Sequence, residues 1–267
     1  MCLIALALAP RPELALVVIA NRDEFHARPA EPMHAWGASG IIAGVDRERG
    51  GTWLGVRAAR GSARFAAVTN VRDPADLRPK EPAEPSRGDL VRAFLEGDED
   101  ALAYAGRVSS DRTMRGFNLL LLDESSLLWC SNRGGALPRR IPRGVHGLSN
   151  AALDTPWPKV ERAKAMLAAA LSRPSGSDVD ALFAILADDA RPDDAALPDT
   201  GVGLALERAL SPIRIETPAY GTRCATVLVV RSDGTATLVE RTLAPAPGPD
   251  VRFEIPAFAI SPRVTTR

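Results

Sequence analysis

The chain has 267 residues, of which 46% are hydrophobic and 25% charged, and this composition is ordinary for a soluble globular protein. Its formal net charge of zero and pI of about 6.9 lack the basic excess of nucleic-acid-binding domains, so we expect no nucleic-acid partner. Three cysteines do not make a disulfide framework or a zinc site, and no apolar run approaches the roughly 20 residues that span a bilayer. We therefore expect a cytoplasmic protein without a transmembrane segment.

Short apolar runs at the start of the chain predict two antiparallel hairpins, over residues 2–9 with 14–20 and over 50–56 with 64–74. The first two runs are joined by the turn sequence PRPE and do not alternate with polar residues. That pattern is typical of strands covered on both faces.

Two helices are predicted next, over 85–97 and 98–108. Ser86 stands at the N-cap of the first helix, Asp89 in the capping-box position and Gly97 at the stop.

The second half of the chain returns to strands and then alternates in blocks. Strands are predicted over 117–123, 127–132 and 144–151, helices over 156–172 and 178–188, a hairpin over 224–244 around Asp233-Gly234, and a last strand over 252–255. The Pro-, Asp- and Gly-rich segment from Arg191 to Glu216 is predicted as a long loop.

The order of these elements predicts an α+β fold. Hairpins dominate and no βα alternation repeats, which favours antiparallel sheets with segregated helices over a parallel sheet. A four-layer αββα sandwich of two antiparallel sheets would cover both faces of each strand. With no linker visible, we expect a single domain over 1–260 and a disordered tail over 261–267.

Polar clusters stand at the ends of several apolar strands, at Asn21–Glu24, Thr69-Asn70, Ser149-Asn150 and Gly221–Cys224. A single cluster of this kind is usually a turn. The three histidines are too scattered for a metal cluster, and no local motif supports a pair between Cys2 and His146.

Cys2 directly follows the start methionine, and cysteine is small enough for that methionine to be removed. Removal would place a thiol and an α-amine on one residue, and the amine, with a pKa of roughly 7.7–8, could serve as a general base. The alternative is that Cys2 is a small apolar residue that opens a buried strand.

A set of sequence blocks resembles the NRDE family, also called the transport and Golgi organization protein 2 family. The blocks occur in the family's order, as MC, ANRDEF..RP, GGTWLGV, A..TN, GFNLL, NRG, GLSNA.LDTPW.K and YGTR...V. They cover the chain from Met1 to about Arg241. The family is similar in pattern to N-terminal nucleophile (Ntn) hydrolases of the choloylglycine hydrolase and penicillin acylase V group, and this likeness also implies an αββα sandwich.

The resemblance implies roles for individual residues. Cys2 would be the nucleophile, Arg22 and Asp23 its flanking pair, and Arg223 the late arginine of the site. Further candidates are two oxyanion or amine ligands, Asn70 and Asn150, and two substrate contacts, Asn21 and Trp53. A nearby arginine would lower the pKa of the cysteine.

One departure concerns the strand that carries the motif. The arginine and aspartate of the hydrolases are two residues apart, whereas Arg22 and Asp23 are adjacent, and neighbours on a regular strand point to opposite faces. If the strand continues, Asn21 and Asp23 share one face, and we then expect them rather than Arg22 to reach Cys2. A bulge or turn would remove the conflict.

Two functions from different classes follow from the resemblance. The first is an amide hydrolase with a cysteine nucleophile, acting on C–N bonds of acyl-amide type other than peptide bonds and requiring no cofactor or metal. The second is a protein that binds haem or an acyl-lipid on the same scaffold without hydrolysis, since a thiolate can also ligate haem iron.

Overall fold

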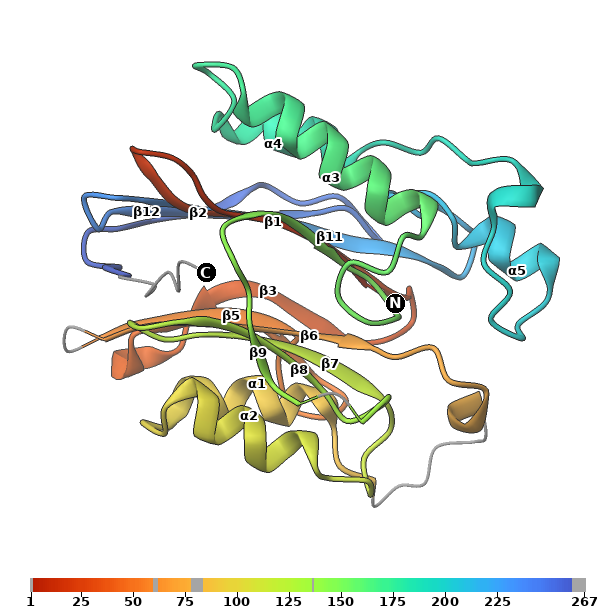
Figure 1. The fold of residues 1–267 in the computed structure, drawn as a ribbon, viewed down its shortest axis with the longest axis horizontal. Helices are drawn as coiled ribbons and strands as arrows, with labels where there is room; N and C mark the ends of the chain where they lie inside the picture. Colours follow the sequence, from red (N-terminus) through yellow and green to blue (C-terminus); the bar gives the residue numbers. More distant parts are fainter. Residues whose placement is uncertain (1, 60–61, 78–83, 136, 261–267) are drawn as a thin grey trace.

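The apolar runs form the strands of two antiparallel sheets that pack face to face (Figure 1). The computed structural model describes residues 2–59, 62–77, 84–135 and 137–260. Met1, whose removal we expect, and the predicted tail 261–267 lie outside the described residues. No helix within these ranges is both long and apolar enough to cross a bilayer.

The six-stranded sheet has the first strand of the chain near its centre. Its strands are, in spatial order, β10 (Gly144–Leu148), β1 (Cys2–Arg11), β2 (Leu14–Phe25), β11 (Tyr220–Arg231), β12 (Ala236–Thr242) and β13 (Val251–Ile255).

The seven-stranded sheet follows the chain order as a meander. Its strands are β3 (Ala30–Ala35), β4 (Ile41–Asp46), β5 (Leu54–Ala59), β6 (Ser62–Asn70), β7 (Phe117–Leu122), β8 (Leu127–Ser131) and β9 (Arg139–Arg140).

Helices cover the outer face of each sheet (Figure 1). α3 (Pro158–Leu171) and α4 (Val179–Leu186) pack on the six-stranded sheet, and α1 (Arg87–Glu96) and α2 (Ala101–Ser109) pack on the seven-stranded sheet. The short helix α5 (Leu204–Ala209) lies beyond them toward one end of the sandwich. The predicted four-layer α+β sandwich is confirmed.

The layers explain why the first strand is apolar on both faces. The even-numbered side chains of Ile4–Leu8 pack between the sheets, and the odd-numbered side chains of Leu3–Ala7 pack against the helices. The same alternation holds on β2, where Val18 and Ala20 face the other sheet and Val17 and Ile19 face the helices.

Most predicted elements are present, and the differences have local causes. Ser86 and Asp89 form the predicted capping box of α1, with Gly97 as its C-cap. The segment predicted as a long loop contains α5, six residues between glycines and prolines. The short strands β3 and β4 were not predicted, because polar and glycine residues interrupt their apolar pattern.

Candidate functional site

A cavity of about 450 Å³ opens between the two sheets, at the end of the sandwich where β1 begins. It is lined by several residues singled out in the sequence: Cys2, Arg22, Asp23, Trp53, Asn70 and Arg223. Asn21 and Asn150, the two other candidates, are not among its lining residues.

Cross-strand pairing places four cavity residues in one row. Cys2 is the direct partner of Arg22 on β2, Arg22 of Cys224 on β11, and Cys224 of Thr242 on β12. Directly opposed residues share a face of the sheet, with Cβ atoms about 4.5–5.5 Å apart. Arg22 therefore lies between two thiols on the cavity side, and its Nη2 is 4.0 Å from Oε2 of Glu24.

The alternation along β2 decides which motif residue faces Cys2. The strand continues to Phe25, so Asn21 lies on the helix side and Arg22 on the cavity side. The expectation that Asn21 would reach Cys2 is wrong, since the register pairs Cys2 with Arg22. Both hydrogen bonds of the buried Asn21 amide are donated to backbone, to Leu186 O at 2.9 Å and Ile213 O at 3.0 Å.

Asp23 lies near the end of β2, where it lines the cavity and pairs across the sheet with Thr222 of β11. Thr222 Oγ1 donates to its Oδ1 at 2.8 Å, and the Tyr220 hydroxyl donates to its backbone carbonyl at 3.1 Å. The residue is 2% exposed. Burial raises the pKa of the Asp23 carboxyl, against the opposing charges of Lys159 and Arg22 and the hydrogen bond from Thr222.

Cys2 is buried as well, and its surroundings favour the neutral thiol. Burial raises the pKa of Cys2 above its usual value and Asp23 raises it further, whereas Arg22 opposes both. The expected influence of a nearby arginine is right in direction for Arg22, but burial outweighs it. A base must therefore remove the thiol proton before the sulfur can act as a nucleophile near neutral pH.

The two sheets are joined by side-chain hydrogen bonds next to Cys2. Ser149 Oγ donates to Cys2 O at 2.9 Å, and Thr69 Oγ1 donates to Ser149 O at 2.6 Å. Asn150 Nδ2 donates to Asn70 O at 2.9 Å. Asn150 is thus buried between strand ends rather than in the cavity wall, and it fixes the position of Asn70, which does line the cavity.

Two further arginines of the cavity wall are held by neighbouring groups. Arg223, at a bulge of β11, donates from Nε to Ala244 O and from Nη1 to Phe25 O, both at 2.8 Å. Arg28 forms an ion pair with Asp46 at 2.7 Å. Arg223 therefore supports the backbone that follows the motif, whereas Arg28 is tied to a carboxylate of β4.

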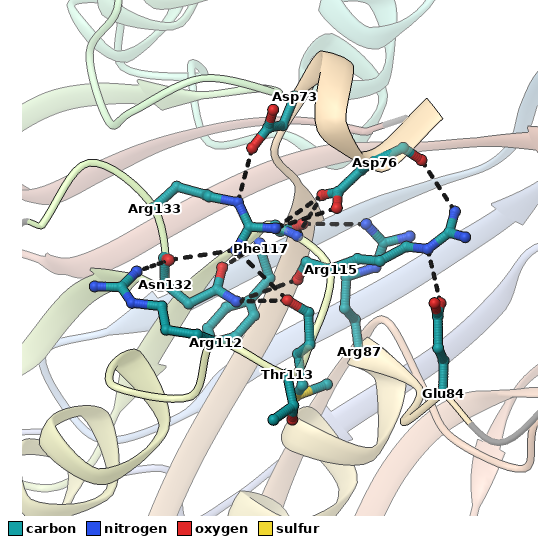
Figure 2. A network of polar contacts seen from close by, with 12 residues as sticks. Asp73, Asp76, Glu84, Arg87, Arg112, Thr113, Arg115, Phe117, Asn132 and Arg133 are labelled. Atoms are coloured by element: carbon teal, nitrogen blue, oxygen red, sulfur yellow. Dashed lines mark hydrogen bonds and ion pairs between the residues drawn. The ribbon is translucent and has the colours of Figure 1, made fainter. Parts of the chain in front are cut away.

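Two arginines that line the cavity, Arg87 and Arg115, are part of a polar network (Figure 2). Arg115 pairs with Glu84 at 2.8 Å, and Arg87 donates to Gly116 O at 3.1 Å. Arg133 pairs with Asp73 and Asp76 behind them. These contacts hold two guanidinium groups, those of Arg87 and Arg115, at the cavity wall across from the motif.

Cys224 and Glu240 line the same cavity. In the sequence, Cys224 was noted only as the end of a polar cluster, and Glu240 was not singled out. Glu240 is 3% exposed, accepts a hydrogen bond from Met33 N at 2.7 Å and is bonded to the Cys224 thiol. Both residues could have been placed from the predicted Asp233-Gly234 turn, because the turn sets the register of its hairpin. Counting back from that hairpin pairs Cys224 with Thr242, and the same pairing places Glu240 on the face of Cys224.

The sequence is similar to known proteins over most of its length. Residues 1–245 match the family described as Transport and Golgi organisation 2. The chain belongs to this family. It is 36% identical to a "Transport and Golgi organization protein 2 homolog" of Bos taurus in an alignment 264 residues long that covers 91% of this chain and 93% of that protein. The Homo sapiens homolog is also 36% identical, with the same coverage, and the Drosophila melanogaster protein is 28% identical over 85% of this chain and 86% of its own length.

Membership of the Transport and Golgi organisation 2 family confirms the resemblance seen in the sequence blocks. In this member of the family, the NRDE block is the end of a central strand rather than a loop. Its four side chains are consequently divided between two sides of one sheet.

Proposed function

We propose that the chain is an amide hydrolase that uses Cys2 as its nucleophile and cleaves the C–N bond of a small acyl amide. The observation that carries the proposal is the position of Cys2, directly opposite Arg22 in a charged cavity, with Asp23 at the same strand end. Likeness in pattern to Ntn hydrolases supports the same residue as the nucleophile.

The proposed base is the α-amine of Cys2 itself, set free when Met1 is removed. No histidine occurs among the described residues that line the cavity, and His146 bonds instead to Asp154 at 2.8 Å. An amine with a pKa near 8 is matched to proton transfer at neutral pH.

The reaction would proceed in two steps. The amine takes the thiol proton, sulfur attacks the carbonyl carbon, and the amine nitrogen of the substrate leaves with that proton, so that a thioester forms on Cys2. Water then attacks the thioester, and the sulfur leaves and takes back a proton as the carboxylic acid departs. Arg22 and the side chain of Asn70, both in the cavity wall, would stabilise the oxyanion of each step.

A second candidate is a carrier of haem or an acyl-lipid on the same scaffold. The names of the relatives, which refer to transport and Golgi organization, favour it. The two cavity thiols, Cys2 and Cys224, would be the groups able to ligate haem iron.

The test compares wild type with Cys2→Ser, using a panel of acyl amides, penicillins and bile-salt conjugates. Hydrolysis predicts turnover by the wild type and a loss of at least about 10²-fold in Cys2→Ser. Cys130→Ser is the matched control, because Cys130 is buried on the helix side of the other sheet. Intact mass would establish whether the active protein starts at Cys2.

Two outcomes would count against the hydrolase. Retained Met1 in a fully active protein would exclude the amine as base. Equal background rates for wild type and Cys2→Ser, together with haem binding that saturates near one equivalent, would favour the carrier.

A further inference from the structure

Lys159 is a buried ammonium group to which the proposed reaction gives no role. It lies in the first turn of α3 and is 4% exposed. Its Nζ donates to Leu210 O at 3.0 Å. Within the described part of the chain, no carboxylate lies within 4.0 Å of Nζ.

This position is unfavourable for a cation in two ways. Burial removes the ammonium from water, and the first turn of a helix carries the positive end of the helix dipole. An ordinary core position would hold an apolar side chain here. A charge that persists under both penalties needs a compensating negative charge nearby.

Hydrogen bonds link Lys159 to the helix side of the six-stranded sheet, next to the strand that carries the NRDE block. The segment between α5 and β11 accepts from Lys159 at Leu210 O and from Asn21 at Ile213 O. Ile215 N of that segment donates to Thr222 Oγ1, and this hydroxyl donates in turn to Asp23 Oδ1. One short segment therefore connects the ammonium to the strand end that carries Asp23.

Four ionisable groups influence Lys159, and the hydrogen-bonded path to Asp23 points to one of them as its partner. They are Asp23 on β2, Arg72 after β6, Cys2 on β1 and Glu207 on α5. Glu207 is paired with Arg72 at 2.6 Å, so that this carboxylate is largely neutralised. Burial lowers the pKa of Lys159 to about 8, and Asp23 is the largest influence that raises it.

We infer that Lys159 is a positioning residue that acts through Asp23, because its ammonium lies behind the strand end and holds the carboxylate in its charged form toward Cys2. The inference rests on the proposed function and adds to it that a charged Asp23 orients the α-amine of Cys2. Lys159 does not line the cavity and does not touch the reacting atoms.

The test follows the titration of Asp23 directly, by carbon-13 NMR of side-chain carboxyls in aspartate-labelled protein, with Asp23→Asn used to assign the signal. Lys159→Met keeps the length of the side chain and removes its charge. The Asp23 pKa should rise by about 1 or more in this variant. Lys164→Met is the matched control on the same helix, because Lys164 pairs with Asp154 and Glu161, and it should leave the Asp23 pKa unchanged.

A reciprocal measurement covers the case in which Lys159→Met does not fold. Asp23→Asn should lower the pKa of Lys159 further, as read from nitrogen-15 NMR of its side chain, because coupling between two sites is mutual. The groups that face Asp23 from neighbouring elements, Cys2, Arg22 and Tyr220, are intact in both experiments.

The outcomes separate this inference from the proposed hydrolysis. An Asp23 titration that is the same in wild type and Lys159→Met, or a Lys159 titration unaffected by Asp23→Asn, overturns the inference. In an active enzyme, the acidic limb of the pH–rate profile should move to higher pH in Lys159→Met. If the Asp23 and Lys159 titrations depend on each other but no amide is hydrolysed, the interaction between the two residues stands and the proposed hydrolase activity is overturned.

Discussion

Cys2 and Cys224 lie on either side of Arg22, yet their surroundings differ. Two strand spacings separate them by roughly 10 Å, too far for a disulfide without movement of the backbone. Both thiols have pKa values raised first by burial, but Cys224 is also bonded to the buried Glu240, whose charge raises its pKa further. Glu240 therefore lowers the reactivity of Cys224, the second thiol of the cavity, by favouring its protonated form.

Alkylation rates test this difference between the thiols. At pH 8, iodoacetamide should modify Cys2 faster than Cys224, and Cys130 slowest of all, since Cys130 is completely buried on the helix side of its sheet whereas the other two thiols line the cavity. Glu240→Gln should accelerate modification of Cys224 several-fold and leave Cys130 unchanged, as measured by peptide mapping after brief labelling. A Cys224 rate unaffected by Glu240→Gln would contradict the assigned role of Glu240.

Sequence reasoning found those site residues that stand in polar clusters and missed those defined by packing. Arg22, Asp23 and Asn70 follow apolar strands directly, and all three line the cavity. Lys159 ends the GLSNA.LDTPW.K block but belongs to no polar cluster, and its burial depends on how α3 packs on the sheet. The side of the sheet that faces Cys2 also depends on strand register, which no single segment determines.

At the scale of elements, the N-terminus of α1 is in direct contact with the turn that precedes β5. Thr52 N donates to Gly88 O at 3.2 Å, and Ser86 caps the helix beside the cavity. A Cβ atom on Gly51 would lie 2.5 Å from the backbone carbon of Gly88. The GGTW block thus needs a glycine at this position because two backbones meet there.

Gly51→Ala should destabilise the protein by about 1–3 kcal/mol, because backbone atoms must move to admit the methyl group. Gly106 offers the matched control. It lies inside α2, where an added Cβ atom would enter open space, so Gly106→Ala should stabilise the protein by about 0.5–1 kcal/mol. Urea unfolding of the three proteins measures both effects, and equal midpoints for wild type and Gly51→Ala would refute the close-contact explanation.

Elements were predictable where a cap or a continuous apolar run marks them. The capping box of α1 and the runs of β1, β2 and β7 are of this kind. α5 has only six residues, and its one buried side chain is Glu207, held by Arg72 rather than by apolar contacts. A helix whose one buried side chain makes polar contacts has no hydrophobic period from which it could be predicted.

At the scale of the whole molecule, three apolar layers enclose a few charges, and these charges make stability depend on pH. Lys159 has a pKa of about 8 in the folded protein and an ordinary value of 10.5 when unfolded. Between these values the unfolded chain binds a proton that the folded chain does not. The free energy of unfolding should therefore rise with pH across this window.

Comparison of wild type with Lys159→Met isolates this contribution from other titrating groups. The wild type should gain stability relative to the variant between pH 8 and 10, by at most about 1.4 kcal/mol per pH unit. Below pH 8 the difference should be constant, since Lys159 is then protonated in both states. Urea unfolding at pH 7, 8 and 10 measures the trend. Parallel curves for the two proteins would mean that Lys159 titrates normally.

The central position of β2 has a consequence for how the NRDE block can vary. β1 and β11 pair with β2 on its two edges, so the register of the strand is fixed. The position of each residue in the NRDE block therefore determines which face of the sheet its side chain occupies. A one-residue insertion after Ala20 would carry Arg22 to the helix side, into the place of Asp23, and bring Asn21 opposite Cys2, with the four letters of the block unchanged. An arginine would then lie on the side of Lys159 and an amide beside the thiol, so a change in spacing should be more harmful than a substitution at a single position.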